Sequence, residues 1–227
     1  MAFFIPKFED IRIIISVQGY QLNNRYIIRE IGFWSPNLRG VIPFNCKLNL
    51  SQADSFGSKN IQIAENEIHG IKLRKIVENG LPSSEAYAVI KTLYHLTKRN
   101  DYDAVYIGIL KDENISSVIF NSGLGKYVFE IETLELLRFS NPNFPAFTDF
   151  KYIIGSELKK YKACKIHEKL RNNEQPLCAK NKAEIVANHI LQLRTQQQQL
   201  QPIQPQSTNF QGQSNDMYNI FTQQMSK

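Results

Sequence analysis

Two cysteines and a histidine form a C-x2-H-x10-C array over residues 164–178, and this array limits the folds open to the chain more than any other feature. Cys164 and His167 are three residues apart, so on a helix they lie on one face and can reach the same ion. The ten residues that follow let the chain return with Cys178. This spacing predicts three of the four ligands of a zinc ion. The alternative is that these are buried thiols that serve only in packing.

The fourth ligand has to come from outside the array, and the N-terminal region offers two candidates. They are Glu30 and Cys46, which is the only other cysteine. Three cysteines is an odd number, and the sequence shows neither an N-terminal signal peptide nor an apolar run long enough to span a bilayer. We therefore expect a reducing intracellular compartment, no disulfides and no membrane segment.

Positive charge is concentrated in the same part of the chain. Residues 151–194 hold ten Lys and Arg against four Glu, which accounts for the whole net charge of +6. Such a face can follow the phosphates of a nucleic acid without reading its bases, whereas the alternatives are a solvated face or a dock for an acidic protein. We expect weak, sequence-tolerant binding of single-stranded or structured RNA through Lys159, Lys160, Lys162, Lys165, Lys169 and Arg171.

The N-terminal half predicts a β-sheet. Apolar, β-branched runs at 11–18 and 26–33 predict a hairpin of two strands. The run at 104–110 is apolar almost throughout, as is typical of a buried parallel strand. Between these runs we expect a long excursion at 35–60 with a short strand at 41–44, and a strand or edge element at 69–74.

Apolar residues at helical spacing predict a helix at about 85–98, with Ser83 or Ser84 as its N-cap. Two further helices are expected at 149–172 and 179–194, and the first of them would carry the basic side chains. From residue 195 to 227 the chain is rich in Gln and Pro with two charged residues, which predicts a disordered tail. The sequence thus predicts one domain at 8–194 and a tail at 195–227.

The order strand, strand, excursion, strand, helix, strand and basic helices is compatible with an RNase H-like α/β fold, a mixed sheet flanked by helices. With this order of elements, the chain resembles the Maelstrom domain. E-I-G at Glu30–Gly32 is similar to the Glu element of that family, and C-K-I-H with the later C-A at 178–179 is similar to its Cys-His-Cys element. The family acts in germline small-RNA (piRNA) silencing and carries one zinc ion on a fold related to DEDD exonucleases. The resemblance implies that Glu30 is the fourth ligand. Cys46 remains the alternative fourth ligand.

The same resemblance allows a test for catalysis. DEDD nucleases need a D-x-E on the first strand, because their acids hold two Mg²⁺ ions about 4 Å apart. The first strand here has Ser16 and Gln18, which cannot hold hard divalent cations, although Asp101, Asp103 and Asp149 remain as acids near later elements. We therefore expect no catalytic residues.

The resemblance implies an RNA-binding scaffold protein of piRNA transposon silencing. Its partners would be RNA and proteins of the silencing machinery, in the cytoplasm, in perinuclear germ granules (nuage) or in the nucleus. The alternative is an active ribonuclease, either a 3′-5′ exonuclease or a metal-independent enzyme.

Overall fold

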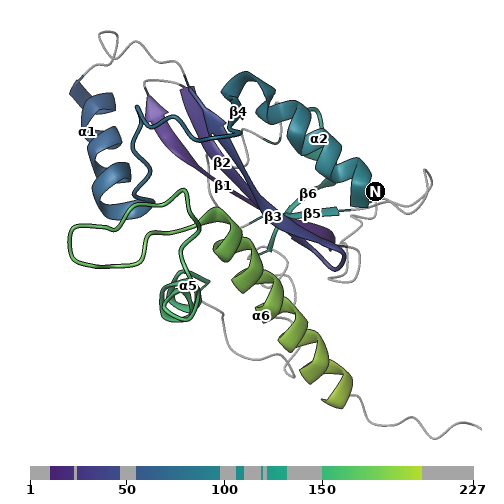
Figure 1. The fold of residues 1–227 in the computed structure, drawn as a ribbon. Helices are drawn as coiled ribbons and strands as arrows, with labels where there is room; N and C mark the ends of the chain where they lie inside the picture. Colours follow the sequence, from purple (N-terminus) through teal and green to yellow (C-terminus); the bar gives the residue numbers. More distant parts are fainter. Residues whose placement is uncertain are drawn as a thin grey trace, which may run out of the picture. The chain divides into compact units, whose positions relative to one another are not determined.

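A single mixed β-sheet forms the centre of the described structure. The structure, a computed structural model, describes residues 11–22, 25–46, 55–97, 106–109, 119, 122–131 and 150–200. The sheet has six strands in the order β4-β3-β2-β1-β5-β6 (Figure 1). Their bounds are β1 Ile11–Leu22, β2 Arg25–Ser35, β3 Leu38–Asn45, β4 Leu81–Pro82, β5 Tyr106–Ile109 and β6 Val128–Glu130.

The strand directions follow from the lengths of the connections. Strands β1, β2 and β3 form an antiparallel meander with two residues between consecutive strands, whereas β5 runs parallel to β1, and β6 runs parallel to β5. The sheet is therefore mixed, with a three-stranded antiparallel meander and parallel strands beyond its first strand, as the predicted α/β fold requires. The predicted hairpin and the predicted parallel strand at 104–110 are both confirmed, and the short strand expected at 41–44 is the eight-residue β3.

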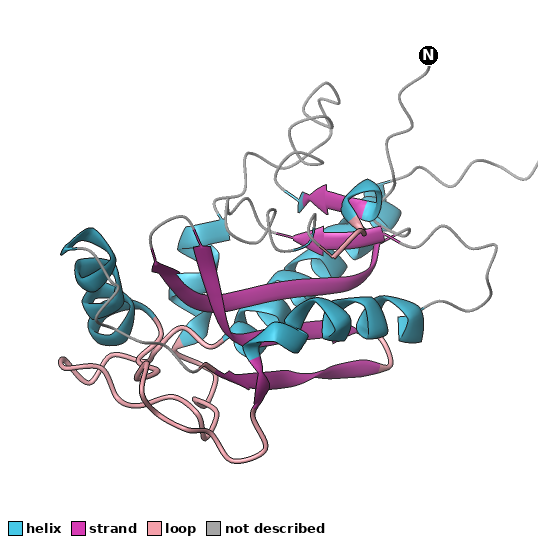
Figure 2. Ribbon diagram, turned by 90° about the horizontal axis from the view of Figure 1, so that it is seen from above, coloured by secondary structure: helices cyan, strands magenta, loops and turns pink. Residues whose placement is uncertain are grey.

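Helices cover both faces of the sheet (Figures 1 and 2). Because successive side chains of a strand point to opposite faces, Ile13 and Ile15 of β1 pack with the apolar side of α2 (Ala86–Thr97). Ile14 faces the other way and packs in the cluster of α5 (Phe150–Leu158) and α6 (Ala179–Leu200). The described part of the chain contains no helix that is long and apolar enough to cross a membrane.

Several predicted boundaries were wrong. α1 (Ser55–Ile63) begins inside the excursion expected at 35–60, and a π-helical turn follows at Ala64–Ile68. Residues 69–74 are loop instead of a strand or edge element. A 3-10 turn at Ser83–Glu85 leads into α2, with Pro82 at its N-cap and no capping bond from a serine side chain. The spacing of apolar residues along the chain does not predict these helices, turns and loops, because contacts with distant segments decide each of them.

The largest difference concerns the helix predicted at 149–172, which ends at Leu158. Residues 159–178 instead form an irregular segment, called the ligand loop below. The last helix begins at 179 as predicted but continues through Leu200, into the Gln-rich run. The chain divides into two compact units, Met1–Gln192 and Leu193–Lys227, and residues 201–227 of the predicted tail lie outside the described residues.

Candidate metal centre

Four side chains capable of binding a metal meet where β2 and the ligand loop come together. Glu30 comes from β2, and Cys164, His167 and Cys178 come from the loop. One ligand atom from each residue lies within 4.8 Å of the other three. The structure therefore brings together the whole set of residues proposed as ligands.

The strand and the start of α6 position two of these residues. Glu30 lies opposite Gln18 of β1, and its Oε1 accepts a 2.7 Å hydrogen bond from the backbone N–H of Ala179. Ala179 is the first residue of α6, so this bond holds Cys178, the residue before it, against the sheet.

A tight turn positions the other two residues. The backbone N–H of His167 donates to the carbonyl of Cys164 over 3.2 Å. This turn places Cys164 and His167 on a common side, as the helix predicted at 149–172 was expected to do, although that helix ends at Leu158.

The cluster is buried and leaves polar atoms without partners. Glu30 and His167 have fully buried side chains, and Cys178 is also fully buried. Cys164 Sγ lies 3.0 Å from His167 Nδ1, and His167 Nε2 lies 3.2 Å from Glu30 Oε1. Despite this short distance, neither His167 Nε2 nor Glu30 Oε2 has a hydrogen-bond partner among the described residues. Each buried, unsatisfied polar atom costs about 1–3 kcal/mol, which a bound cation would offset.

The protonation of the cluster suits cation binding. A hydrogen bond from Cys178 holds the pKa of Cys164 well below its usual range, which favours the thiolate form of Cys164. The same bond, together with burial, raises the pKa of Cys178. Burial favours neutral His167, but its hydrogen bond with Cys164 and the nearby Glu30 carboxylate outweigh burial and raise its pKa to about 9. A divalent cation would replace the protons on Cys178 and His167.

The donor set fits a tetrahedral ion. With metal–sulfur bonds near 2.3 Å and metal–nitrogen or –oxygen bonds near 2.1 Å, neighbouring ligand atoms of a tetrahedral ion stand about 3.4–3.8 Å apart. The atoms of the cluster lie within 4.8 Å of one another, so small side-chain adjustments would complete the geometry. Two thiolates, one imidazole and one carboxylate can therefore hold one metal ion.

Cys46, the reserve candidate for the fourth ligand, lies elsewhere. Its half-buried thiol accepts a 3.2 Å hydrogen bond from Nη1 of Arg29 and packs beside Leu73. Arg29 is itself almost fully buried, with its other terminal nitrogen bonded to backbone carbonyls of the segment after α1. Glu30, and not Cys46, is therefore the residue that stands beside the loop ligands.

The six basic side chains proposed to bind RNA lie on the ligand loop and not on one helix. All six are exposed, namely Lys159, Lys160, Lys162, Lys165, Lys169 and Arg171. Lys160 pairs with Glu157 at 2.6 Å. The positive charge thus lies on an irregular segment instead of forming a straight helical stripe.

Contacts along its length fasten the ligand loop to the domain. Asn181 of α6 donates its side-chain amide to the carbonyl of Lys162 over 3.1 Å. Further along, Lys75 pairs with Glu168 at 3.0 Å, and the N–H of Leu177 donates to Ile68 O over 2.9 Å. These contacts come from both sides of the cluster, so the loop has a defined path without regular secondary structure.

The first strand carries neutral side chains at the two positions examined for catalysis. Ser16 and Gln18 are buried and alternate with Ile15 and Val17, so they face the side of the sheet on which α6 packs. The Ser16 hydroxyl has no hydrogen-bond partner among the described residues. The acids proposed as alternatives, Asp101, Asp103 and Asp149, fall outside the described residues.

Comparisons with known proteins give structural neighbours only. No family model matches the sequence, and no curated protein matches it. Among solved structures, the Mopeia virus exonuclease domain partially complexed with manganese is similar with a TM-score of 0.44 and 13% identity. The same domain depleted of manganese is similar with a TM-score of 0.48 and 15% identity. Each similarity covers 80% of this chain and 77% of the viral chain.

Proposed function

We propose that this chain is an RNA-binding protein whose RNase H-like domain lacks two-metal catalysis and is stabilised by one structural zinc ion. One observation carries the proposal: the loop with six exposed basic side chains is also the loop that supplies three of the four clustered ligands. A metal at this place would fix the positions of the cations, because Cys164 and His167 lie within their run. Basic residues held on a defined path can follow a phosphate backbone.

Zinc is the metal that the donor atoms favour. Thiolate and imidazole ligands suit zinc, whereas magnesium, calcium and manganese prefer sites made of oxygen atoms. Four protein ligands form a closed set with no position for water or substrate, as in structural zinc sites. The ion would thus hold β2, the ligand loop and the start of α6 together and take no part in catalysis.

The first prediction concerns RNA binding. Replacing Lys159, Lys162 and Lys169 together with alanine should weaken the binding of a single-stranded RNA and make its salt dependence shallower. The slope of log K against log salt is negative, and each lost phosphate contact reduces its magnitude by about 0.7 for single strands. We therefore expect the magnitude of the slope to fall by about 2. Fluorescence anisotropy over a series of salt concentrations measures this slope.

A matched triple variant controls for the loss of three positive charges. Lys59, Arg74 and Lys91 are exposed on other parts of the domain, so their joint replacement with alanine should leave the slope nearly unchanged. Both variants should retain their metal and their denaturation midpoint. If the loop variant binds RNA with wild-type affinity and slope, the loop is not the RNA-binding surface.

The second prediction concerns catalysis. Because Ser16 and Gln18 offer no carboxylate, adding Mg²⁺ or Mn²⁺ should not cause trimming of a labelled single-stranded RNA, while an active exonuclease in the same buffer should trim it fully. Metal-dependent trimming that disappears when Asp101, Asp103 and Asp149 are changed to asparagine would instead support the ribonuclease alternative.

The biological setting that we propose rests on the resemblance to Maelstrom domains. It is germline piRNA silencing of transposons, with protein partners from that machinery and a location in the cytoplasm, in perinuclear granules or in the nucleus. Sequencing the RNA that co-purifies with a tagged chain from germ cells tests this setting. Enrichment of transposon transcripts is expected, and a profile equal to total cellular RNA would count against it.

A further inference from the structure

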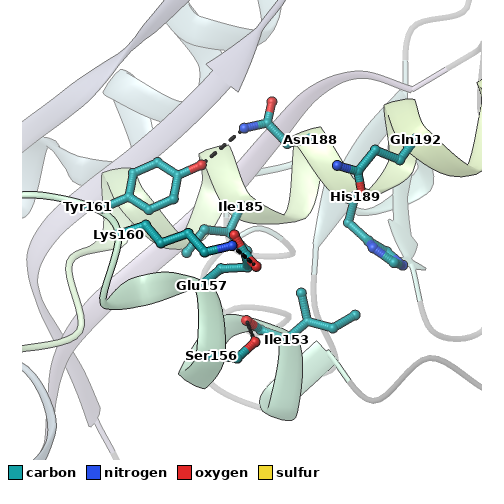
Figure 3. Close-up of a pocket in the computed structure, with 9 residues that line it drawn as sticks. All are labelled: Ile153, Ser156, Glu157, Lys160, Tyr161, Ile185, Asn188, His189 and Gln192. Carbon is teal, nitrogen blue, oxygen red and sulfur yellow. Dashed lines mark hydrogen bonds and ion pairs between the residues drawn. The ribbon is translucent and has the colours of Figure 1, made fainter.

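A pocket opens between α5 and α6, beside the first residues of the ligand loop (Figure 3). Its volume is about 310 Å³, near the lower end of the range for small-molecule sites. Ile153 of α5 and Ile185 of α6 give it apolar walls, and side chains of both helices line it together with Lys160 and Tyr161. This pocket was not predicted, because the helix expected at 149–172 would have continued past Leu158, where the chain instead leaves α5.

The polar groups of the pocket can serve a further partner. Tyr161 Oη accepts a 3.0 Å hydrogen bond from the Asn188 amide, as Figure 3 shows, which leaves the phenol hydrogen and the Asn188 carbonyl for other bonds. His189 Nε2 is a buried atom without a hydrogen-bond partner among the described residues. Burial lowers the pKa of His189, so its ring is neutral at pH 7. The pocket thus offers donors and acceptors without an uncompensated charge.

We propose that this pocket takes one unpaired base from RNA that is bound along the ligand loop. The inference rests on the proposed RNA-binding function and adds to it a preference for unpaired nucleotides. Lys159 is exposed where the loop leaves α5, next to Lys160 of the pocket lining, so a phosphate held by Lys159 would place its base at the mouth of the pocket.

The lining favours a base over a small anion or an apolar side chain. Lys160 is paired with Glu157 at 2.6 Å, so the site carries no net positive charge that would hold a free anion. An apolar side chain would offer no partner to the phenol hydrogen of Tyr161 or to the side-chain carbonyl of Asn188. A base has flat apolar faces for Ile153 and Ile185, and its edge carries both donors and acceptors.

The experiment compares two RNA probes and a pocket-filling variant. The probes are a fluorescein-labelled single-stranded 12-mer and a blunt duplex of the same length. Wild-type protein should bind both through phosphates and prefer the single strand. Ser156 is exposed and lines the pocket, so Ser156→Phe should fill the space and weaken single-strand binding about tenfold, which is the effect of losing one held base. Duplex binding should stay within about twofold of wild type.

A neighbouring position supplies the matched control. A side chain added at Gly155 would meet no atom within 4 Å, and Gly155 does not line the pocket, so Gly155→Phe adds the same ring to the same helix without filling the space. It should bind both probes as wild type does. His189→Phe keeps an aromatic ring beside Phe150 but removes Nε2, so it should fold normally and weaken single-strand binding alone.

The outcomes separate this inference from the proposal on which it rests. Selective loss of single-strand affinity in Ser156→Phe and His189→Phe supports base capture. Wild-type single-strand affinity in Ser156→Phe, or an equal loss for both probes, overturns base capture while RNA binding stands. Failure of wild-type protein to bind either probe overturns the RNA-binding function itself.

Discussion

Changing Cys164 to serine should remove the metal from the protein and lower its stability by on the order of 4 kcal/mol or more. Wild-type protein should purify with one zinc ion per chain, and the variant should purify with none. A structural zinc site contributes its binding energy directly to folding, because the unfolded chain has no preformed site. Metal analysis by plasma mass spectrometry and urea denaturation measure the two effects.

The loss should exceed that of an ordinary buried thiol because the cluster is a single unit. Without the metal, a fully buried carboxylate and imidazole keep unpartnered atoms, and Cys178 and His167 keep their protons. The ligand loop is then held only by its remaining hydrogen bonds and ion pairs. Treating wild-type protein with a strong chelator should therefore lower its denaturation midpoint to that of the variant.

Three further variants make this test specific. Cys46→Ser should retain zinc, because Cys46 lies beside Arg29 and apart from the cluster. Glu30→Gln keeps an acceptor for the Ala179 N–H but loses the charge, so it should bind zinc more weakly than wild type. Wild-type protein without zinc, or full zinc occupancy in Cys164→Ser, would contradict a structural zinc site. Zinc bound normally by Glu30→Ala but lost from Cys46→Ser would transfer the fourth position to Cys46.

The sequence predicted the parts of this molecule that depend on short spacings. The runs that became β1 and β2 are apolar and β-branched over most of their length, and they pair as expected. The three loop ligands were apparent because cysteine is scarce in this chain, and a three-residue separation puts Cys164 and His167 side by side in a tight turn as well as in a helix. Glu30 was proposed from a resemblance, since one glutamate on a strand has no local signature.

Features fixed by distant contacts were missed. Residues 159–172 contain few helix-breaking residues, yet they leave the helix because Cys164 and His167 turn toward Glu30 and because α6 and Ile68 hold the loop backbone. The pocket between α5 and α6 exists only because α5 ends at Leu158. Arg29 is a similar case, because a buried arginine bonded to distant carbonyls cannot be distinguished in sequence from an exposed one.

Gly32 provides the sharpest test of how the start of α6 meets the sheet. Changing Gly32 to alanine should destabilise the protein by about 3 kcal/mol or more and lower its affinity for zinc at least tenfold. The added methyl group would stand 2.0 Å from the backbone carbonyl carbon of Ala179 and 2.3 Å from the backbone nitrogen of Lys180. Backbone atoms cannot rotate away as a side chain can, so the strand and the helix would have to separate.

That separation would reach the metal ligands directly. Gly32 pairs with Ser16 and Val41 in the middle of the sheet, so β2 cannot shift without breaking its bonds to both neighbours. The start of α6 would move instead, taking Cys178 away from Cys164 and lengthening the 2.7 Å bond from Ala179 to Glu30. Urea denaturation reports the stability, and competition with a fluorescent chelator reports the affinity for zinc.

Gly155→Ala is the matched control, because it makes the same chemical change where the added methyl group meets nothing within 4 Å. Replacing a glycine inside a helix with alanine usually stabilises a protein by about 0.5–1 kcal/mol, so this variant should denature at the same or a slightly higher urea concentration and keep its zinc. If Gly32→Ala behaves like this control, β2 and α6 do not approach as closely as the structure places them. A variant that loses stability but holds zinc with wild-type affinity would mean that the cluster tolerates movement of α6, and that the ligand loop positions Cys178 without the help of the helix.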